Sequence, residues 1–226
     1  MYVPAHFAPD EALVDELLRN HGAADLVTLT EQGLVATMLP FIYVPPAEAD
    51  AGGSDTGGSD TGGPRAAGQY GALHGHLARN NHQWKLGAVG EALAIVRGPD
   101  AYISPGWYSS KAEHGRVVPT WNYVTAHVYG RLVVHDDPVW TEHLVRRLTT
   151  KHEAGNEHPW SVDDAPRKFI DGQLRAIVGI ELEITRIEAK AKLSQNRPPA
   201  DIDGVIAGLR ERGDKASADA VERARG

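Results

Sequence analysis

Cysteine is absent from this chain of 226 residues, and long apolar runs are absent with it. Without a thiol, the protein can form no disulfide, no thiolate metal site and no cysteine nucleophile. No apolar run approaches the length that a membrane span needs, and the first residues carry charges and prolines where a signal peptide needs an apolar run. These absences predict a cytoplasmic protein with no membrane partner.

Positive charge is also scarce. The net charge is −7, which disfavours a general affinity for nucleic acid because phosphate binding needs clustered positive charge. The distribution is uneven, since residues 186–226 contain nine Lys and Arg against seven Asp and Glu. A mildly basic tail on an acidic body leaves DNA as a possible partner, although a solvated helical surface explains the tail more simply.

Alternation of apolar and polar residues predicts about seven strands. Pro40 interrupts the second of them, which favours an edge position or a bulge there. Few helices separate the strands, so a β-barrel with helices at its ends is favoured over a doubly wound α/β fold. The expected strands cover 24–30, 33–44, 69–78, 91–98, 101–108, 118–135 and 178–185, and the expected helices cover 9–21, 136–153, 163–171 and a tail from residue 201.

One domain is expected over residues 1–197, followed by a helical tail over 198–226 that packs on the barrel or on a partner subunit. Within the domain, residues 54–63 contain SDTGG twice in tandem. Such a segment cannot bury a core, so residues 46–69 are expected to form a flexible insertion loop.

A polar run follows the strand that contains His74 and His76. These histidines lie two residues apart, so both face one side of a strand, but no acidic cluster accompanies them and we expect no metal site. Arg79, Asn80 and Lys85 come next. They offer charge-assisted donors for a phosphate, or they form a polar turn, and their spacing does not choose between the two.

Aromatic residues gather between residues 102 and 130. Trp107, Tyr108, Trp121 and Tyr123, with short polar side chains such as Asn122 between them, could form a pocket for a flat ligand. From composition alone, a sheet core with cross-strand aromatic pairs is slightly favoured over such a pocket. The segment 109–118 between them is expected to be a polar loop.

Six blocks resemble the PaiB family of FMN-binding negative transcriptional regulators: MYVPAHF, ATMLPF, GHLARNNHQWK, GPDAYISPGWY, VPTWNYVTAHVYG and KLSQNR. They occur in order over roughly residues 1–200. The resemblance implies a mostly β fold with peripheral α-helices, namely an FMN-binding split β-barrel similar to pyridoxamine-phosphate oxidase. It also implies a homodimer with FMN at the subunit interface.

The resemblance further implies a set of flavin contacts. The strand along the isoalloxazine edge is Ala36, Thr37 and Met38. The strand end at the phosphate is His76, Leu77, Ala78, Arg79 and Asn80, with Lys85 nearby. The partner subunit contributes Trp121 and Asn122, and Lys192 and Gln195 near the C-terminus are further contacts.

Two classes of function remain open at this stage. The resemblance implies negative transcriptional regulation, with flavin as a bound cofactor or sensor, whereas the acidic body and the absence of a helix-turn-helix signature count against direct DNA readout. The alternative is an FMN-dependent oxidoreductase acting on a small heterocycle, or a haem-binding or haem-degrading split barrel. The sequence does not choose a catalytic residue.

Overall fold

Seven strands form one sheet in the computed structural model, which describes residues 1–46 and 70–225. The strand order is β2-β1-β5-β6-β7-β4-β3, and the pairs β1–β2, β1–β5, β3–β4 and β4–β7 are antiparallel. Pro40 separates β2 from β3, and these are the two edge strands, so the expected edge position is confirmed. The strands are β1 (Ala24–Thr30), β2 (Gly33–Leu39), β3 (Ile42–Val44), β4 (Ala72–Ala78), β5 (Ala92–Ile103), β6 (Thr120–His135) and β7 (Ile177–Lys192).

Helices flank the strands, and the mostly β fold with peripheral α-helices is confirmed. At the start of α5, the Asp137 carboxylate accepts a hydrogen bond from the Val139 N–H (2.9 Å) and Pro138 takes the first helical position, as expected. The helices are η1 (Ala5–Phe7), α1 (Glu11–Asn20), α3 (Gln83–Leu86), η3 (Pro105–Trp107), α4 (Ser110–His114), α5 (Pro138–Glu153), η4 (Val162–Asp164), α6 (Arg167–Arg175), α7 (Pro199–Glu211) and α8 (Lys215–Arg223).

Several expectations about local structure were wrong. The expected strands 91–98 and 101–108 form one strand, β5, followed by the turn η3, and the expected strand 33–44 is divided into β2 and β3. The segment expected to be a polar loop contains α4, which ends where Gly115 adopts a left-handed conformation (φ 66°) and its N–H bonds the Lys111 carbonyl. The short helix expected at 163–171 lies further along the chain, because the Ser161 capping box starts the separate turn η4 and α6 begins only after Pro166. The expected insertion loop lies outside the described residues.

The chain consists of two compact units. Unit 1 comprises residues 1–17, 97–126 and 188–226, and unit 2 comprises residues 18–96 and 127–187. No helix in the described ranges is long and apolar enough to cross a membrane.

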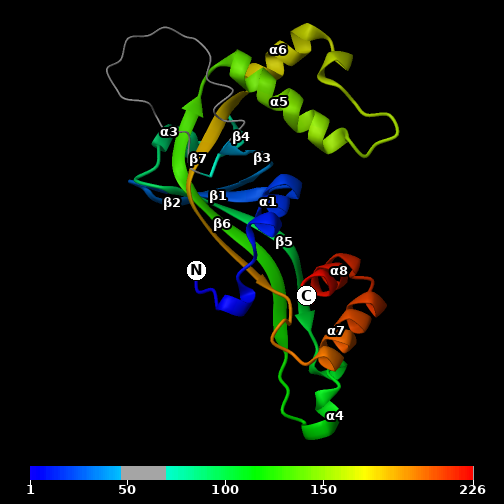
Figure 1. Cartoon of the computed structure of the whole chain (residues 1–226). Helices are drawn as coiled ribbons and strands as arrows, with labels where there is room; N and C mark the ends of the chain where they lie inside the picture. Colours follow the sequence, from blue (N-terminus) through cyan, green and yellow to red (C-terminus); the bar gives the residue numbers. More distant parts are fainter. Residues whose placement is uncertain (47–69, 226) are drawn as a thin grey trace. The chain divides into compact units, whose positions relative to one another are not determined.

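In unit 1, α7 and α8 lie side by side (Figure 1) and share a core with β5. Ile202 and Val205 of α7 pack in the same buried cluster as Ile103. The contact between α7 and η3 depends on glycine, because a Cβ atom on Gly208 would lie 2.4 Å from the ring of Trp107. Unit 1 therefore uses small residues on α7 to seat a tryptophan.

In unit 2, α5 packs against β3 and β4 around Trp140. The indole stacks on the His135 ring with centroids 4.1 Å apart and planes at 10°. On β7, a Cβ atom at Gly179 would lie 2.3 Å from the same indole. Trp140 is thus clamped between a histidine ring and a strand position that only glycine can occupy without displacement.

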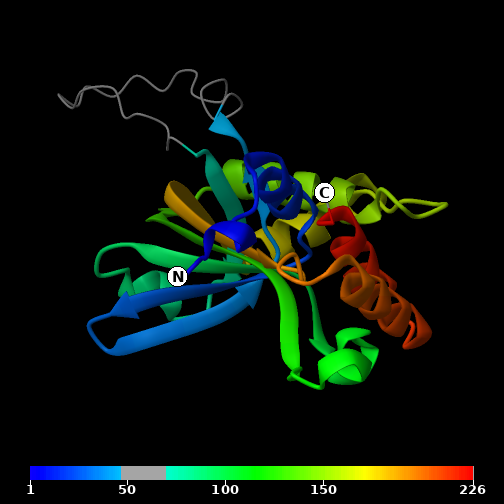
Figure 2. The same cartoon turned by 60° about the horizontal axis from the view of Figure 1, so that its bottom comes forward.

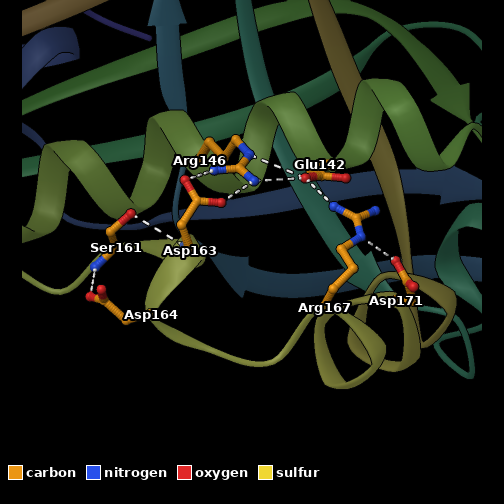
Figure 3. Close-up of polar contacts among 7 residues, drawn as sticks. All are labelled: Glu142, Arg146, Ser161, Asp163, Asp164, Arg167 and Asp171. Atoms are coloured by element: carbon orange, nitrogen blue, oxygen red, sulfur yellow. Dashed lines mark hydrogen bonds and ion pairs between the residues drawn. The ribbon is translucent and has the colours of Figure 1, made fainter.

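Ion pairs connect α5 to η4 and α6 (Figure 3). Glu142 accepts from Arg146 (2.9 Å) and from Arg167 (2.7 Å), and Arg146 also holds Asp163 (2.8 Å). Asp171 completes the chain of contacts through Arg167 (2.7 Å). Because several charges share partners, this network restrains the segment after α5 better than isolated surface pairs would.

Candidate functional site

The strand expected to follow the flavin ring is β2, at an edge of the sheet in unit 2. Ala36 and Met38 face outward, and Met38 is 71% exposed. Thr37 faces the other way, where its hydroxyl accepts a hydrogen bond from the Asn81 amide (3.0 Å). The register pairs Leu29 with Leu34, so the outward face of the β1–β2 hairpin, drawn in blue in Figure 2, is largely apolar.

Three expected residues occupy the end of β4. Leu77 is buried in the core and Ala78 is exposed at the strand end. His76 is partly buried, and burial lowers the pKa of its imidazole, so the ring is neutral near pH 7. Its Nδ1 atom is buried without a hydrogen-bond partner. His76 is therefore a neutral ring with unused hydrogen-bonding capacity.

The guanidinium of Arg79 is engaged within unit 2. It forms a two-pronged ion pair with Asp136 (2.6 and 3.1 Å) and donates to the carbonyls of Arg175 (2.7 Å) and Ile177 (3.1 Å). The hydrogen bond with Asp136 raises the pKa of Arg79 and lowers the pKa of Asp136. A phosphate could bind Arg79 only in exchange for this carboxylate.

Asn80 and Lys85 are both exposed beside the end of β4. The Lys85 ammonium lies 5.3 Å from the centroid of the Trp84 ring. These two side chains are placed to donate to an anion without first breaking an ion pair of unit 2.

Sequence reasoning missed two residues that shape this region. Gln83 is fully buried, and its amide points to the carbonyl of Leu26 (3.0 Å) and the hydroxyl of Thr28 (3.2 Å). The side-chain Oδ1 of Asn81 accepts from the Gln83 backbone N–H (2.9 Å), and its side-chain NH₂ donates to Thr37 of β2. These polar bonds fix the turn after β4 to the β1–β2 hairpin. Only the polar run NNHQ signalled them.

Trp121 and Asn122 lie in unit 1, next to each other on β6, and face opposite ways. Trp121 is 49% exposed, and its indole N–H donates to Asp100 (3.1 Å). Asn122 is 1% exposed, and its amide donates to the Ser194 hydroxyl (2.9 Å). Of the two, only Trp121 presents its side chain at the surface of the unit.

The two C-terminal candidates also lie in unit 1 and make internal bonds. The Lys192 ammonium contacts the Thr120 hydroxyl and donates to the Trp121 carbonyl (2.8 Å). Burial lowers the pKa of Lys192, with smaller contributions from Lys190 and Arg197. Gln195 folds back on its own strand end, donating to the Ala191 carbonyl (2.6 Å) and accepting from the Leu193 N–H (2.7 Å).

The aromatic segment divides into core and surface. Tyr108 is 3% exposed and Trp107 packs against the same buried cluster of unit 1, so these rings belong to a core and not to a ligand wall. Trp107 lies in η3 and packs against α7, so this core differs from the expected sheet core with cross-strand aromatic pairs. Burial raises the pKa of Tyr108. Tyr123 is half-buried and lies 5.6 Å from the Lys190 ammonium. Only Trp121 keeps the character expected of a ligand wall.

The residues of unit 2 suit a flavin in part. An exposed apolar strand face such as Ala36–Met38 can take a flat ring, and Asn80 and Lys85 can take the phosphate end. Arg79, as placed, is held by Asp136. The site so described combines an open antiparallel sheet, a free edge strand and a polar turn, which is the arrangement of a split-barrel flavoprotein.

Comparison with known proteins agrees with this class. The chain matches the model of the family described as "Putative FMN-binding domain" over residues 1–186, and it therefore belongs to that family. It is 36% identical over 135 residues to the protease synthase and sporulation protein PAI 2 of Bacillus subtilis, covering 59% of this chain and 62% of that protein. The expected membership of the PaiB family is confirmed.

Two further comparisons follow, one with a protein sequence and one with a solved structure. The uncharacterized protein AN0679 of Emericella nidulans is 28% identical over 248 residues, which is 96% of this chain and 93% of that protein. Among solved structures, the flavocytochrome Anf3 of Azotobacter vinelandii aligns with a TM-score of 0.52 at 12% identity, covering 80% of this chain and 67% of that chain. This structural likeness supports the split-barrel fold.

Proposed function

We propose that the chain is a homodimeric FMN-binding protein in which the outward face of the β1–β2 hairpin contacts flavin and a second copy. The exposure of that face carries the proposal. Leu34 is 75% exposed, Met38 71% and Leu29 47%, all on adjacent antiparallel strands. A contiguous apolar patch of this kind marks a ligand or protein interface.

In this proposal the strand Ala36–Met38 lies along the ring edge, with the side chains of Ala36 and Met38 toward the ring and Thr37 contributing its backbone. Asn80 and Lys85 hold the phosphate. Leu77 supports the strand from the core, while Ala78 leaves room at its end. FMN, once bound, supplies one- and two-electron chemistry. The remaining proposed contacts follow the resemblance: His76 and Arg79 on the phosphate side, Trp121 and Asn122 from the partner subunit, and Lys192 and Gln195 beyond them.

Flavin binding and dimer formation are tested separately. Purified protein is titrated with FMN while flavin fluorescence is followed, and its mass in solution is measured by sedimentation. Leu34→Lys places a charge on the exposed face outside the proposed flavin contacts, so it should yield monomers. Thr150→Lys, at an exposed position of α5, is the matched control. A monomeric wild-type protein, or a dimer that Leu34→Lys leaves intact, would contradict the proposed interface.

The role of Arg79 is tested through its partner. Asp136→Asn frees the guanidinium, so FMN should bind several-fold more tightly if Arg79 reaches the phosphate. Riboflavin, which has no phosphate, is the control ligand and should be unaffected. Equal effects on both ligands would remove Arg79 from the phosphate site.

For the biological role, we propose negative transcriptional regulation of the PaiB type, with flavin as bound cofactor or sensor. Family membership supports this role, and DNA would then be a partner. A gel-shift experiment at physiological salt, with oxidised and reduced protein, tests it. Absence of a sequence-selective shift in both states would exclude direct repression.

A second candidate is an FMN-dependent oxidoreductase, because the ion pairs of the basic tail weaken the case for DNA binding. Arg210 pairs with Glu222 (2.6 Å), Arg223 with Glu16 (2.8 Å), and Arg225 with Asp203 (2.5 Å). Arginines neutralised in this way contribute little to phosphate binding. Reduction of bound flavin by NAD(P)H and reoxidation by small acceptors would support an enzyme. A Soret band in the visible spectrum would instead identify haem as the ligand.

A further inference from the structure

Unit 2 contains a surface cavity of about 290 Å³ that is open to solvent and lies beside α5 and His76 of β4. Its apolar walls come from Pro40, Val145, Leu148 and the indole of Trp160. Its polar lining comes from His76, Thr149, His152 and Glu153. An apolar cavity of about 150 Å³ binds benzene, so this volume has room for one bicyclic ring system.

The segment that carries Trp160 is held by its backbone. The backbone N–H of Trp160 donates to the Glu153 carboxylate (2.9 Å), which also accepts from the Asn156 side-chain amide (2.6 Å). The next residue, Ser161, forms the capping box of η4, and Asp163 in η4 is held by the ion-pair network on α5 (Figure 3). The backbone that carries Trp160 is therefore ordered before a ligand binds, and the half-exposed indole would be covered by the ligand.

The lining selects for ligand chemistry. The hydrogen bonds from Trp160 and Asn156 lower the pKa of Glu153, so its carboxylate stays ionised and disfavours anionic ligands. The same carboxylate can accept a hydrogen bond from a ligand N–H. The His76 ring is desolvated and has an orphaned nitrogen, so it favours an uncharged neighbour that brings its own polar group.

We propose that this cavity is a binding site for a small, uncharged nitrogen heterocycle of one or two rings that carries an N–H. The ring lies against Trp160 and the aliphatic side chains of α5, and the N–H is directed to Glu153. This site goes beyond flavin binding and does not require it. His76 is the residue that the cavity shares with the proposed flavin contacts.

The test uses indole as the probe and benzofuran, its near-isostere without an N–H, as the matched ligand. Both are titrated into the full-length protein by isothermal calorimetry. Indole should bind several-fold more tightly than benzofuran, because only indole has an N–H that can donate to the Glu153 carboxylate. Thr149→Trp fills the cavity and should abolish indole binding. Thr150→Trp, on the adjacent exposed position, should not.

Other outcomes overturn the proposal. No indole binding up to the solubility limit, or equal binding of indole and benzofuran, would exclude the N–H site. A Thr149→Trp protein that loses FMN together with indole would assign the cavity to the flavin site. If Thr149→Trp does not fold, Glu153→Gln replaces it and should weaken indole without changing benzofuran. FMN titration of the wild type reports separately on the proposed function, so either can fail alone.

Discussion

Replacing Glu181 by Gln should remove a major stabilising contact of unit 2. Glu181 lies on β7 and accepts from His135 Nε2 (2.8 Å), with His74 Nε2 at 3.4 Å from its other oxygen. His74 lies on β4 and His135 on β6, and the His135 ring stacks on Trp140 of α5. The Glu181 carboxylate therefore connects β7 to all three elements. The hydrogen bonds from His135 and then His74 lower the pKa of Glu181 from 4.5 to about 2, against the opposing effect of burial.

The magnitude follows from linkage. One pKa unit corresponds to about 1.4 kcal/mol, so a fall from 4.5 to about 2 contributes on the order of 3 kcal/mol to the free energy of unfolding. Because the pKa is lowered in the folded state, this stability is present above pH 4.5 and is lost as the pH falls toward 2. In a protein of this size, about 3 kcal/mol corresponds to a fall in Tm of roughly 6–12 °C.

Thermal and urea unfolding of Glu181→Gln and the wild type, followed by circular dichroism at pH 7 and at steps down to pH 3, measures this difference. Glu183→Gln is the matched control, because Glu183 lies two residues along the same strand and pairs with a half-exposed Arg131. Such a pair contributes about 0–1 kcal/mol. If Glu181→Gln costs no more than Glu183→Gln at pH 7, or if its cost stays constant down to pH 3, the reasoning is refuted.

Two further predictions concern packing and burial. Gly179→Val places side-chain atoms against Trp140, whose ring lies 2.3 Å from the position of a Cβ atom, and should lower the free energy of unfolding by about 1–3 kcal/mol in urea titrations. The control Gly172→Ala lies in open space on α6 and should be neutral or stabilising. Equal effects of the two substitutions would contradict the packing argument. Burial lowers the pKa of His21 from 6.5 to about 4, so below pH 6.5 the unfolded chain binds a proton that the folded chain does not bind. The free energy of unfolding should therefore decrease as the pH falls from 6.5 to 4. His21→Asn should reduce this dependence of the free energy of unfolding on pH, whatever its effect at pH 7. An unchanged dependence would show that other groups cause it.

Much of the architecture could be predicted from local patterns. The alternation in residues 24–30 and 120–135 marks strands, Asp137 and Pro138 mark the start of α5, and Pro40 marks a break at a sheet edge. Each of these signals acts through dihedral preference, capping or side-chain period, which are properties of a few neighbouring residues. The blocks that resemble PaiB also led to the correct family.

The partners of the polar side chains depended on the tertiary structure. Arg79 looked like a phosphate ligand from its neighbours, but folding places Asp136 against it, 57 residues away. Tyr108 looked like a ligand wall, but α7 and its neighbours bury it in a core. The sequence by itself determined most strand positions, the start of α5 and the family, because these follow from local geometry and shared blocks. Only the tertiary structure decided which charges are paired, which aromatic rings are buried and where the cavity beside His76 lies. Each of these depends on residues that folding brings together from distant parts of the chain.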